Sequence, residues 1–122
     1  MARIMVVDDE PGVLEFLETE LTAQYHEVET ALNGREAIEK MKTHRPHLML
    51  LDINMPEMDG FQTLYEAKKI NPRLIVVLVT AKSLAETASE ARQLDADEFI
   101  GKPIDLDYLN RIVTTKLCEL LG

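Results

Sequence analysis

Residues 48–56 read LMLLDINMP, and this stretch decides the fold. Four apolar residues run without interruption and then meet one carboxylate, Asp52. Such a run is typical of a strand that is buried on both faces of a parallel sheet, and it is too short for an independent helix. Pro56 and Gly60 then end the strand and turn the chain. The pattern places Asp52 at the carboxyl end of a central strand, and open α/β sheets bind their ligands beyond that edge.

The rest of the chain alternates between strand-like and helix-like segments. Residues 3–7 and 74–80 are further apolar runs, residues 26–31 alternate as in an edge strand, and residues 98–101 predict a short last strand. Apolar residues at helical spacing follow the strands within residues 11–21, 37–41, 61–70, 83–94 and 105–121. This order predicts an α/β fold in which a five-stranded parallel sheet carries five helices on its two faces.

Length and composition restrict the class of protein. The 122 residues suffice for one domain, which we expect to span residues 1–122. No apolar run approaches the roughly 20 residues of a membrane span, and no signal-peptide pattern follows Met1. The single cysteine, Cys118, excludes an internal disulfide and suits a reducing, cytoplasmic environment. The formal net charge of −9 argues against unaided binding to nucleic acid or to anionic membranes, which both require a basic patch.

The histidines offer no site of their own. His26, His44 and His47 lie at the ends of the predicted elements, without the spacing to Asp, Glu or Cys that a metal site requires. We therefore expect all three to be surface residues.

Polar side chains follow the predicted strands at the points where these strands end. Asp8 and Asp9 follow residues 3–7, Asp52 ends the central strand, Thr80 ends residues 74–80, and Lys102 follows residues 98–101. Because the carboxyl ends of parallel strands meet at one edge, we expect three carboxylates, one hydroxyl and one ammonium group to converge there. An aspartate after a strand is often only a helix cap, so the coincidence of all five positions carries the argument.

The charges of this set indicate its chemistry. Two carboxylates about 5 Å apart repel by roughly 3 kcal/mol at an effective dielectric constant near 20, so three of them require a counter-charge. Lys102 supplies one positive charge, and a divalent cation would supply two. Ligand sets made only of oxygen select Mg²⁺, which often bridges carboxylates and a phosphoryl group. A carboxylate can also take a phosphoryl group as an acyl phosphate, with Thr80 and Lys102 contacting the phosphoryl oxygens.

These motifs together resemble the receiver domain of two-component response regulators. The resemblance rests on Asp8-Asp9, on LDINMPEMDG at residues 51–60, on Thr80-Ala81 and on Lys102-Pro103, and it covers essentially the whole chain. It implies a flavodoxin-like, doubly wound sheet with the strand order 2-1-3-4-5.

The resemblance also implies a role for each site residue. Asp52 would be the phosphoacceptor, Lys102 would pair with the phosphoryl group, and the Thr80 hydroxyl would move toward it. Phe99 stands three residues before Lys102, at the position of the family's switch aromatic, but it lacks the hydroxyl of a tyrosine. The Mg²⁺ ion would be held directly by Asp9, mainly through water by Asp8, and also by Asp52 and the backbone carbonyl of Asn54.

The function implied is a signalling switch rather than a classical enzyme. A sensor histidine kinase or a histidine phosphotransfer protein would donate the phosphoryl group to Asp52. The face formed by residues 83–94, 99–101 and 105–121 would then change shape to control a downstream protein, or the phosphoryl group would be relayed onward. We expect a monomer, or a weak dimer through that face, with no direct contact to nucleic acid or membrane.

Two other functions remain open at this point. One is a Mg²⁺-dependent phosphohydrolase with Asp52 as its nucleophile. Haloacid-dehalogenase-type phosphatases place a second aspartate two residues after the nucleophile, where this chain has Asn54. The other is a pseudo-receiver that only binds partners, and the intact set of acidic residues argues against it.

Overall fold

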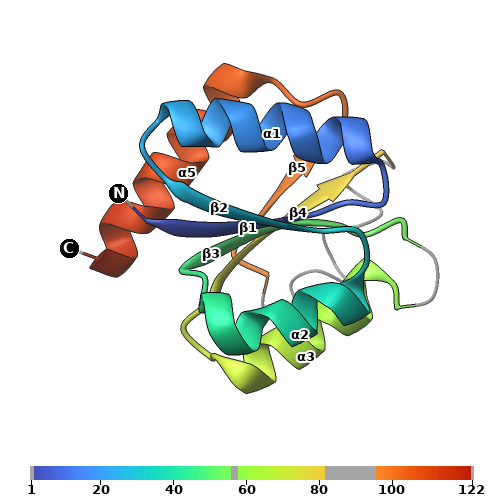
Figure 1. The fold of residues 1–122 in the computed structure, drawn as a ribbon. Helices are drawn as coiled ribbons and strands as arrows, with labels where there is room; N and C mark the ends of the chain where they lie inside the picture. The colour runs from blue at the N-terminus through green and yellow to red at the C-terminus, as the bar shows by residue number, and fades with distance from the viewer. Residues whose placement is uncertain (1, 56–57, 82–95, 122) are drawn as a thin grey trace.

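The computed structural model describes residues 2–55, 58–81 and 96–121 as a parallel sheet with helices on both faces (Figure 1). The strands lie side by side in the order β2-β1-β3-β4-β5, and every neighbouring pair is parallel. This confirms the predicted sheet and its strand order. The elements are β1 (Arg3–Val7), α1 (Pro11–Ala23), β2 (Glu27–Ala31), α2 (Gly34–His44), β3 (Leu48–Asp52), α3 (Gly60–Ile70), β4 (Ile75–Thr80), β5 (Glu98–Gly101) and α5 (Leu106–Leu121).

Five helices were expected, and the described residues contain four of them, α1, α2, α3 and α5. The remaining predicted helix, over residues 83–94, lies outside the described residues. None of the described helices combines the length and apolarity needed to cross a bilayer.

The sheet separates two apolar layers because successive side chains of a strand point to opposite faces. On β1, Ile4 and Val6 join the core cluster that includes α1 and α5, whereas Met5 and Val7 join the cluster that includes α2 and α3. In Figure 1 the two helix pairs accordingly cover opposite faces of the sheet. All five residues of β3 are buried, which confirms the prediction that this strand lies at the centre.

Side chains at the helix starts explain where the helices begin. Pro11 opens α1 at a position where its missing N–H costs no hydrogen bond. The Asn33 side-chain oxygen accepts the backbone N–H of Glu36 at 2.8 Å at the start of α2. The Asp59 carboxylate accepts the backbone N–H of Gln62 at 2.8 Å at the start of α3. Asp105 likewise accepts from the Tyr108 N–H at 3.2 Å, just before the start of α5.

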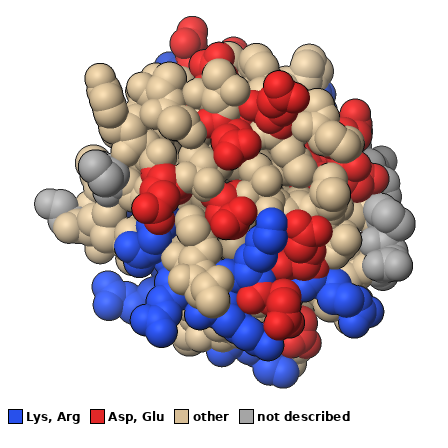
Figure 2. All heavy atoms as spheres, viewed as in Figure 1, with Lys and Arg blue, Asp and Glu red and all other residues tan. Residues whose placement is uncertain are grey.

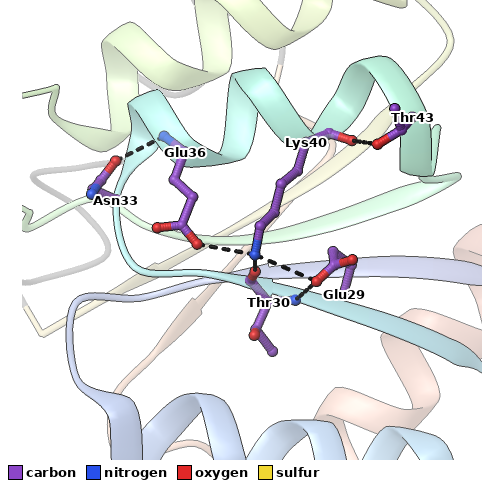
Figure 3. A network of polar contacts seen from close by, with 6 residues as sticks. All are labelled: Glu29, Thr30, Asn33, Glu36, Lys40 and Thr43. Atoms are coloured by element: carbon purple, nitrogen blue, oxygen red, sulfur yellow. Dashed lines mark hydrogen bonds and ion pairs between the residues drawn. The ribbon is translucent and has the colours of Figure 1, made fainter.

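Lys40 ties α2 to the edge strand β2. Its ammonium group donates to the backbone carbonyl of Thr30 at 2.6 Å and lies 3.0 Å from Glu36 and 3.5 Å from Glu29 (Figure 3). An edge strand leaves one row of backbone groups without a neighbouring strand. The lysine satisfies one of these carbonyls and gathers two carboxylates around it, so the polar face of β2 is joined to its helix.

The prediction that the histidines are surface residues is wrong for His44. Its side chain is only 9% exposed, and neither ring nitrogen has a hydrogen-bond partner among the described residues. His47 is partly buried, and its Nδ1 accepts the backbone N–H of Arg3 at 3.0 Å. The His44 Nε2 lies 3.9 Å from a carboxylate oxygen of Glu27 on β2, and His47 is hydrogen-bonded to the start of β1. A sequence reading of element ends does not reveal these neighbours.

Candidate functional site

The register of β1 and β3 places two carboxylates next to each other. Val7 pairs with Leu51, so the next residues along the two strands are Asp8 and Asp52. The Asp8 N–H still donates to the Ala31 carbonyl at 3.1 Å, which holds Asp8 at the edge of the sheet. Each aspartate is only 3% exposed. Adjacent apolar strands thus bury two acidic side chains at the carboxyl edge, where the sequence predicts them.

Lys102 contacts both carboxylates. Its Nζ lies 3.4 Å from Asp8 Oδ2 and 3.5 Å from Asp52 Oδ2. The lysine side chain is 23% exposed, so its ammonium group reaches the carboxylates from the solvent side of the edge. The ends of β1, β3 and β5 therefore converge on one cation, as predicted from the parallel arrangement.

The backbone of β4 positions Lys102. Thr80 ends β4 opposite Gly101, and its carbonyl accepts the Lys102 N–H at 2.8 Å. The Thr80 residue is fully buried at the same edge as the carboxylates. Leu78 pairs with Phe99, and Thr80 lies two residues beyond Leu78, so Thr80 and Phe99 share one face of the sheet. Phe99 is partly buried and packs against the cluster beneath α2 and α3.

The site electrostatics favour a neutralising ligand. Burial raises the pKa of Asp52, and the charge of Asp8 adds to this effect, while the Asn54 N–H and Lys102 offset only part of it. Burial lowers the pKa of Lys102, but the Asp52 and Asp8 carboxylates outweigh this effect and raise it overall. Two buried carboxylates therefore share a single ammonium group, and further positive charge at this edge would be favourable.

The acidic residues at the end of β1 form a group that could hold a cation. Carboxylate oxygens of Asp8, Asp9 and Glu10 lie within 4.8 Å of one another, with Asp8 buried and the other two exposed. A donor set made only of oxygen suits a hard cation such as Mg²⁺. The sequence prediction named Asp8 and Asp9 but not Glu10, which also lies 4.0 Å from the Lys102 ammonium group. Its position directly after the aspartate pair is the signal that could have identified it.

Asn54 is held close to Asp52 by the turn that follows β3. The Asn54 N–H donates to Asp52 Oδ1 at 3.0 Å, and the Asn54 residue is exposed. This bond orients the Asp52 carboxylate and leaves its second oxygen toward Lys102. The predicted phosphoryl and metal positions thus lie together at one edge of the sheet. Phe99 lies on β5, on the same face of the sheet as Thr80.

Comparison with known proteins assigns the chain to a family. Residues 4–114 match the family model of the response regulator receiver domain. This chain belongs to that family. Receiver domains are signalling modules rather than classical enzymes, and phosphorylation and Mg²⁺ binding at an acidic site are general features of them.

Curated relatives of this receiver domain are longer proteins. Regulatory protein AtoC of Escherichia coli K12 is 43% identical over 115 residues, which are 94% of this chain and 25% of AtoC. Transcriptional regulatory protein ZraR of Escherichia coli K12 is 40% identical over 116 residues, which are 95% of this chain and 26% of ZraR. The chain therefore spans about a quarter of the length of these relatives.

Solved structures show the same receiver fold. A CheY-like receiver domain from Methanospirillum hungatei superposes with a TM-score of 0.93 at 30% identity, covering 98% of this chain and 96% of that one. The response regulator protein TrrA from Thermotoga maritima, solved in complex with Mg²⁺ and BeF, gives a TM-score of 0.85 at 35% identity. That match covers 95% of this chain and 99% of TrrA.

Proposed function

We propose that Asp52 of this receiver domain accepts a phosphoryl group from the phosphohistidine of a sensor histidine kinase or a histidine phosphotransfer protein. A carboxylate oxygen of Asp52 would form the new P–O bond while the P–N bond to the donor imidazole breaks. The bonding electrons would stay on the imidazole nitrogen, which takes up a proton. The product is an acyl phosphate on the protein.

The contact of Lys102 with both Asp52 and Asp8 carries this proposal. An ammonium group that already lies 3.5 Å from the Asp52 carboxylate is positioned to pair with phosphoryl oxygens attached to the same carboxylate. The Asn54 N–H, bonded to Oδ1 of Asp52, would keep the other carboxylate oxygen turned toward the incoming group. Positioning and charge, rather than proton transfer by a side chain, would thus be the contribution of the protein.

A bound Mg²⁺ ion would neutralise the carboxylates and the phosphoryl oxygens. We propose that Asp9 binds it directly, Asp8 mainly through water, and Asp52 and the Asn54 backbone carbonyl complete the protein ligands. The all-oxygen chemistry of these residues and the cluster of Asp8 with Asp9 support this assignment.

We further propose that the phosphoryl group draws the Thr80 hydroxyl toward Asp52 and that Phe99 turns into the space beside it. The position of both residues on one face of neighbouring strands supports this coupling. The output face would consist of residues 83–94, which lie outside the described residues, together with β5 and α5. It would control a downstream protein or relay the phosphoryl group, with the domain acting in the cytoplasm as a monomer or a weak dimer.

The phosphoacceptor is tested by intact-mass analysis. Acetyl phosphate with Mg²⁺ should add one phosphoryl group to the wild-type chain, and Asp52→Asn should abolish the adduct. Asp107→Asn, an exposed position on α5, is the matched control and should be phosphorylated normally. An adduct that persists in Asp52→Asn would refute the proposal.

A further inference from the structure

The positive charges of this acidic chain are not evenly distributed. The sequence has 22 Asp and Glu residues against 13 Lys and Arg. In Figure 2 the Lys and Arg side chains gather over the lower half of the molecule, where Figure 1 places α2 and α3, whereas Asp and Glu predominate above them. The basic residues on or next to these two helices are Arg35, Lys40, Lys42, Arg45, Lys68, Lys69 and Arg73.

Two hollows lie among these charges at the amino edge of the sheet. The first, of about 270 Å³, lies between the ends of α2 and α3. The second, of about 240 Å³, lies beside it and shares Asn71. We call them together the amino-edge surface, lined by Met41, Lys42, Arg45, Pro46, His47, Ile70, Asn71, Arg73, Leu120 and Leu121.

The walls of the amino-edge surface are apolar and its rim is basic. Ile70 is 47% exposed and Leu121 is 53% exposed, although both are large aliphatic residues. No residue that lines either hollow is acidic. Arg45 and Arg73 form no ion pair with any residue in the described part of the chain. Lys42 has only an exposed partner, Glu39, at 3.4 Å, and pairs of this kind contribute little.

The usual preference of helix ends for cations explains only part of this rim. Lysines in the last turn of a helix interact favourably with its dipole, which accounts for Lys42 and Lys69. Arg45 caps α2 from outside the helix, and Arg73 stands beyond the end of α3. Neither guanidinium group has a carboxylate partner within the described residues, and Arg73 also lies beyond the last turn of α3, where the helix dipole no longer acts.

We infer that the amino-edge surface docks an acidic peptide segment of a partner protein, with large apolar side chains of that segment in the two hollows. Carboxylates flanking these side chains would pair with Arg45 and Arg73, since a guanidinium fork suits a carboxylate. Each hollow is of the size that receives a side chain rather than a whole ligand. Nucleic acid fits less well, because the apolar walls offer it nothing and the net charge of −9 repels an extended polyanion.

The location leaves the phosphoacceptor accessible. Pro46 and His47 precede β3, and Asp52 ends it, so the two sites lie at opposite ends of one strand. The five residues of β3 separate them by roughly 13 Å of strand at the usual rise per residue. A partner held at the amino edge can therefore stay bound while a phosphoryl donor approaches Asp52.

Amide NMR titration with defined probes tests the proposal on the whole chain without Mg²⁺, so that it is independent of the phosphoryl chemistry. The first probe is a peptide of Glu, Asp and Leu. Further probes replace its Leu residues by Ser, replace its acidic residues by Lys, or substitute a short single-stranded DNA. We expect the acidic leucine peptide alone to shift amides of residues 41–47 and 70–73, and this binding should weaken with added salt.

Substitutions that reverse the basic charges or remove an apolar wall residue provide a second test. Arg45→Glu combined with Arg73→Glu should weaken peptide binding by about tenfold or more, equivalent to losing about 1.4 kcal/mol. Ile70→Ser should weaken it without changing the charge, whereas Arg111→Glu, on α5 outside the hollows, should leave it unchanged. Amide shifts of each variant that match those of the wild type away from the substituted positions confirm that the variant is folded.

Three results would overturn the inference. The first is that the acidic leucine peptide shifts no amide of the amino-edge surface. The second is that the serine peptide or the DNA binds there equally well. The third is that Arg111→Glu weakens peptide binding as much as the double reversal does. The second result would reduce the surface to a non-specific attraction for anions.

Discussion

Asp8, Asp52 and Lys102 place one ammonium group between two buried carboxylates, and this arrangement determines the electrostatics of the site. The lysine lies 3.4 and 3.5 Å from the two aspartates, which are each 3% exposed. Burial, reinforced by the charge of Asp8, raises the pKa of Asp52. The metal-free site therefore holds two buried carboxylates against one ammonium group, an unfavourable balance of charge to which burial contributes most.

We predict that Asp8→Asn stabilises the metal-free protein. The change removes one of two neighbouring carboxylates and keeps an oxygen that can accept the Glu10 N–H, so the free energy of unfolding should rise by about 1–3 kcal/mol. The same variant should lose most of the stabilisation that Mg²⁺ gives to the wild type, because a ligand stabilises only in proportion to its binding to the native state. Urea unfolding with and without Mg²⁺ measures both effects, and Glu15→Gln on α1 is the control. A metal-free Asp8→Asn protein less stable than the wild type would show that repulsion between the Asp8 and Asp52 carboxylates does not destabilise the site.

The three histidines make the stability of the protein depend on pH. Burial lowers the pKa of His26, His44 and His47 below the ordinary value of 6.5. For His44, Glu29 and Glu27 offset part of this effect, and Arg3 adds to it. The unfolded chain therefore binds these protons more tightly than the folded one.

We predict that the free energy of unfolding is highest above pH 6.5 and falls as the pH drops through the lowered pKa values of the folded histidines. Because the raised pKa of Asp52 acts in the opposite direction, the comparison belongs in an Asp52→Asn background. There His44→Gln should flatten the pH dependence, and NMR titration of the ring protons should give a His44 pKa below 6.5. A His44 pKa above that value would show that Glu27 and Glu29 outweigh burial.

At the scale of elements, two glycines allow the first turns of α2 and α3 to lie close to their neighbours. A Cβ on Gly34 would overlap Thr63 Oγ1 and would lie 3.1 Å from the Met58 carbonyl oxygen. A Cβ on Gly60 would overlap the Ile53 Cα. Thr63 cannot turn away freely, because its hydroxyl donates to the Asp59 carbonyl at 2.9 Å. Close approach of backbone, rather than a special backbone angle, therefore requires glycine at these positions.

Gly34→Ala should consequently destabilise the protein although alanine is the better helix former. We expect the free energy of unfolding to fall by about 1–3 kcal/mol, which is typical of overpacking. Gly12→Ala is the matched control, since a Cβ at Gly12 in α1 has no atom within 4 Å. It should leave stability unchanged or raise it by up to about 1 kcal/mol through helix propensity. Thermal unfolding of both variants decides the matter, and equal effects would exclude steric crowding at Gly34.

At the scale of the whole molecule, the site edge shares more residues with one face of the sheet than with the other. Thr80 and Phe99 lie on the face that α2 and α3 cover, and the Lys102 N–H is bonded to the Thr80 carbonyl. α1 contacts the opposite face, through Leu14, Leu17 and Leu21. A shift of Thr80 would thus pass first into β5 and the segments next to it.

We predict that beryllofluoride with Mg²⁺, a phosphoryl mimic, perturbs the amides of β5 more than those of residues 13–21. The bias required is only a few kcal/mol between two states. Amide chemical shifts or hydrogen exchange measure it, and Thr80→Ala should reduce the effect on β5. Equal perturbation of residues 13–21 and of β5 would place the output face elsewhere.

The sequence by itself determined the sheet, the order of the elements and the identity of the edge residues. Runs such as residues 48–51 and 75–79 are apolar on both faces, and a chain can bury both faces of a strand only at the centre of a covered sheet. Parallel strands then bring Asp8, Asp52 and Lys102 to one edge, whatever the details of packing. These are consequences of local pattern and of a small number of allowed topologies.

Only the tertiary structure decided which side chains meet. Lys102 and Asp8 are 94 positions apart, and the contact of their charged groups depends on the register of β1, β3, β4 and β5. The burial of His44 and the amino-edge surface, which combines residues from the ends of α2, α3 and α5, carry no local signal. Side chains with no periodic relation to one another become neighbours only when the helices pack on the sheet, because that contact depends on distance in space and not along the chain.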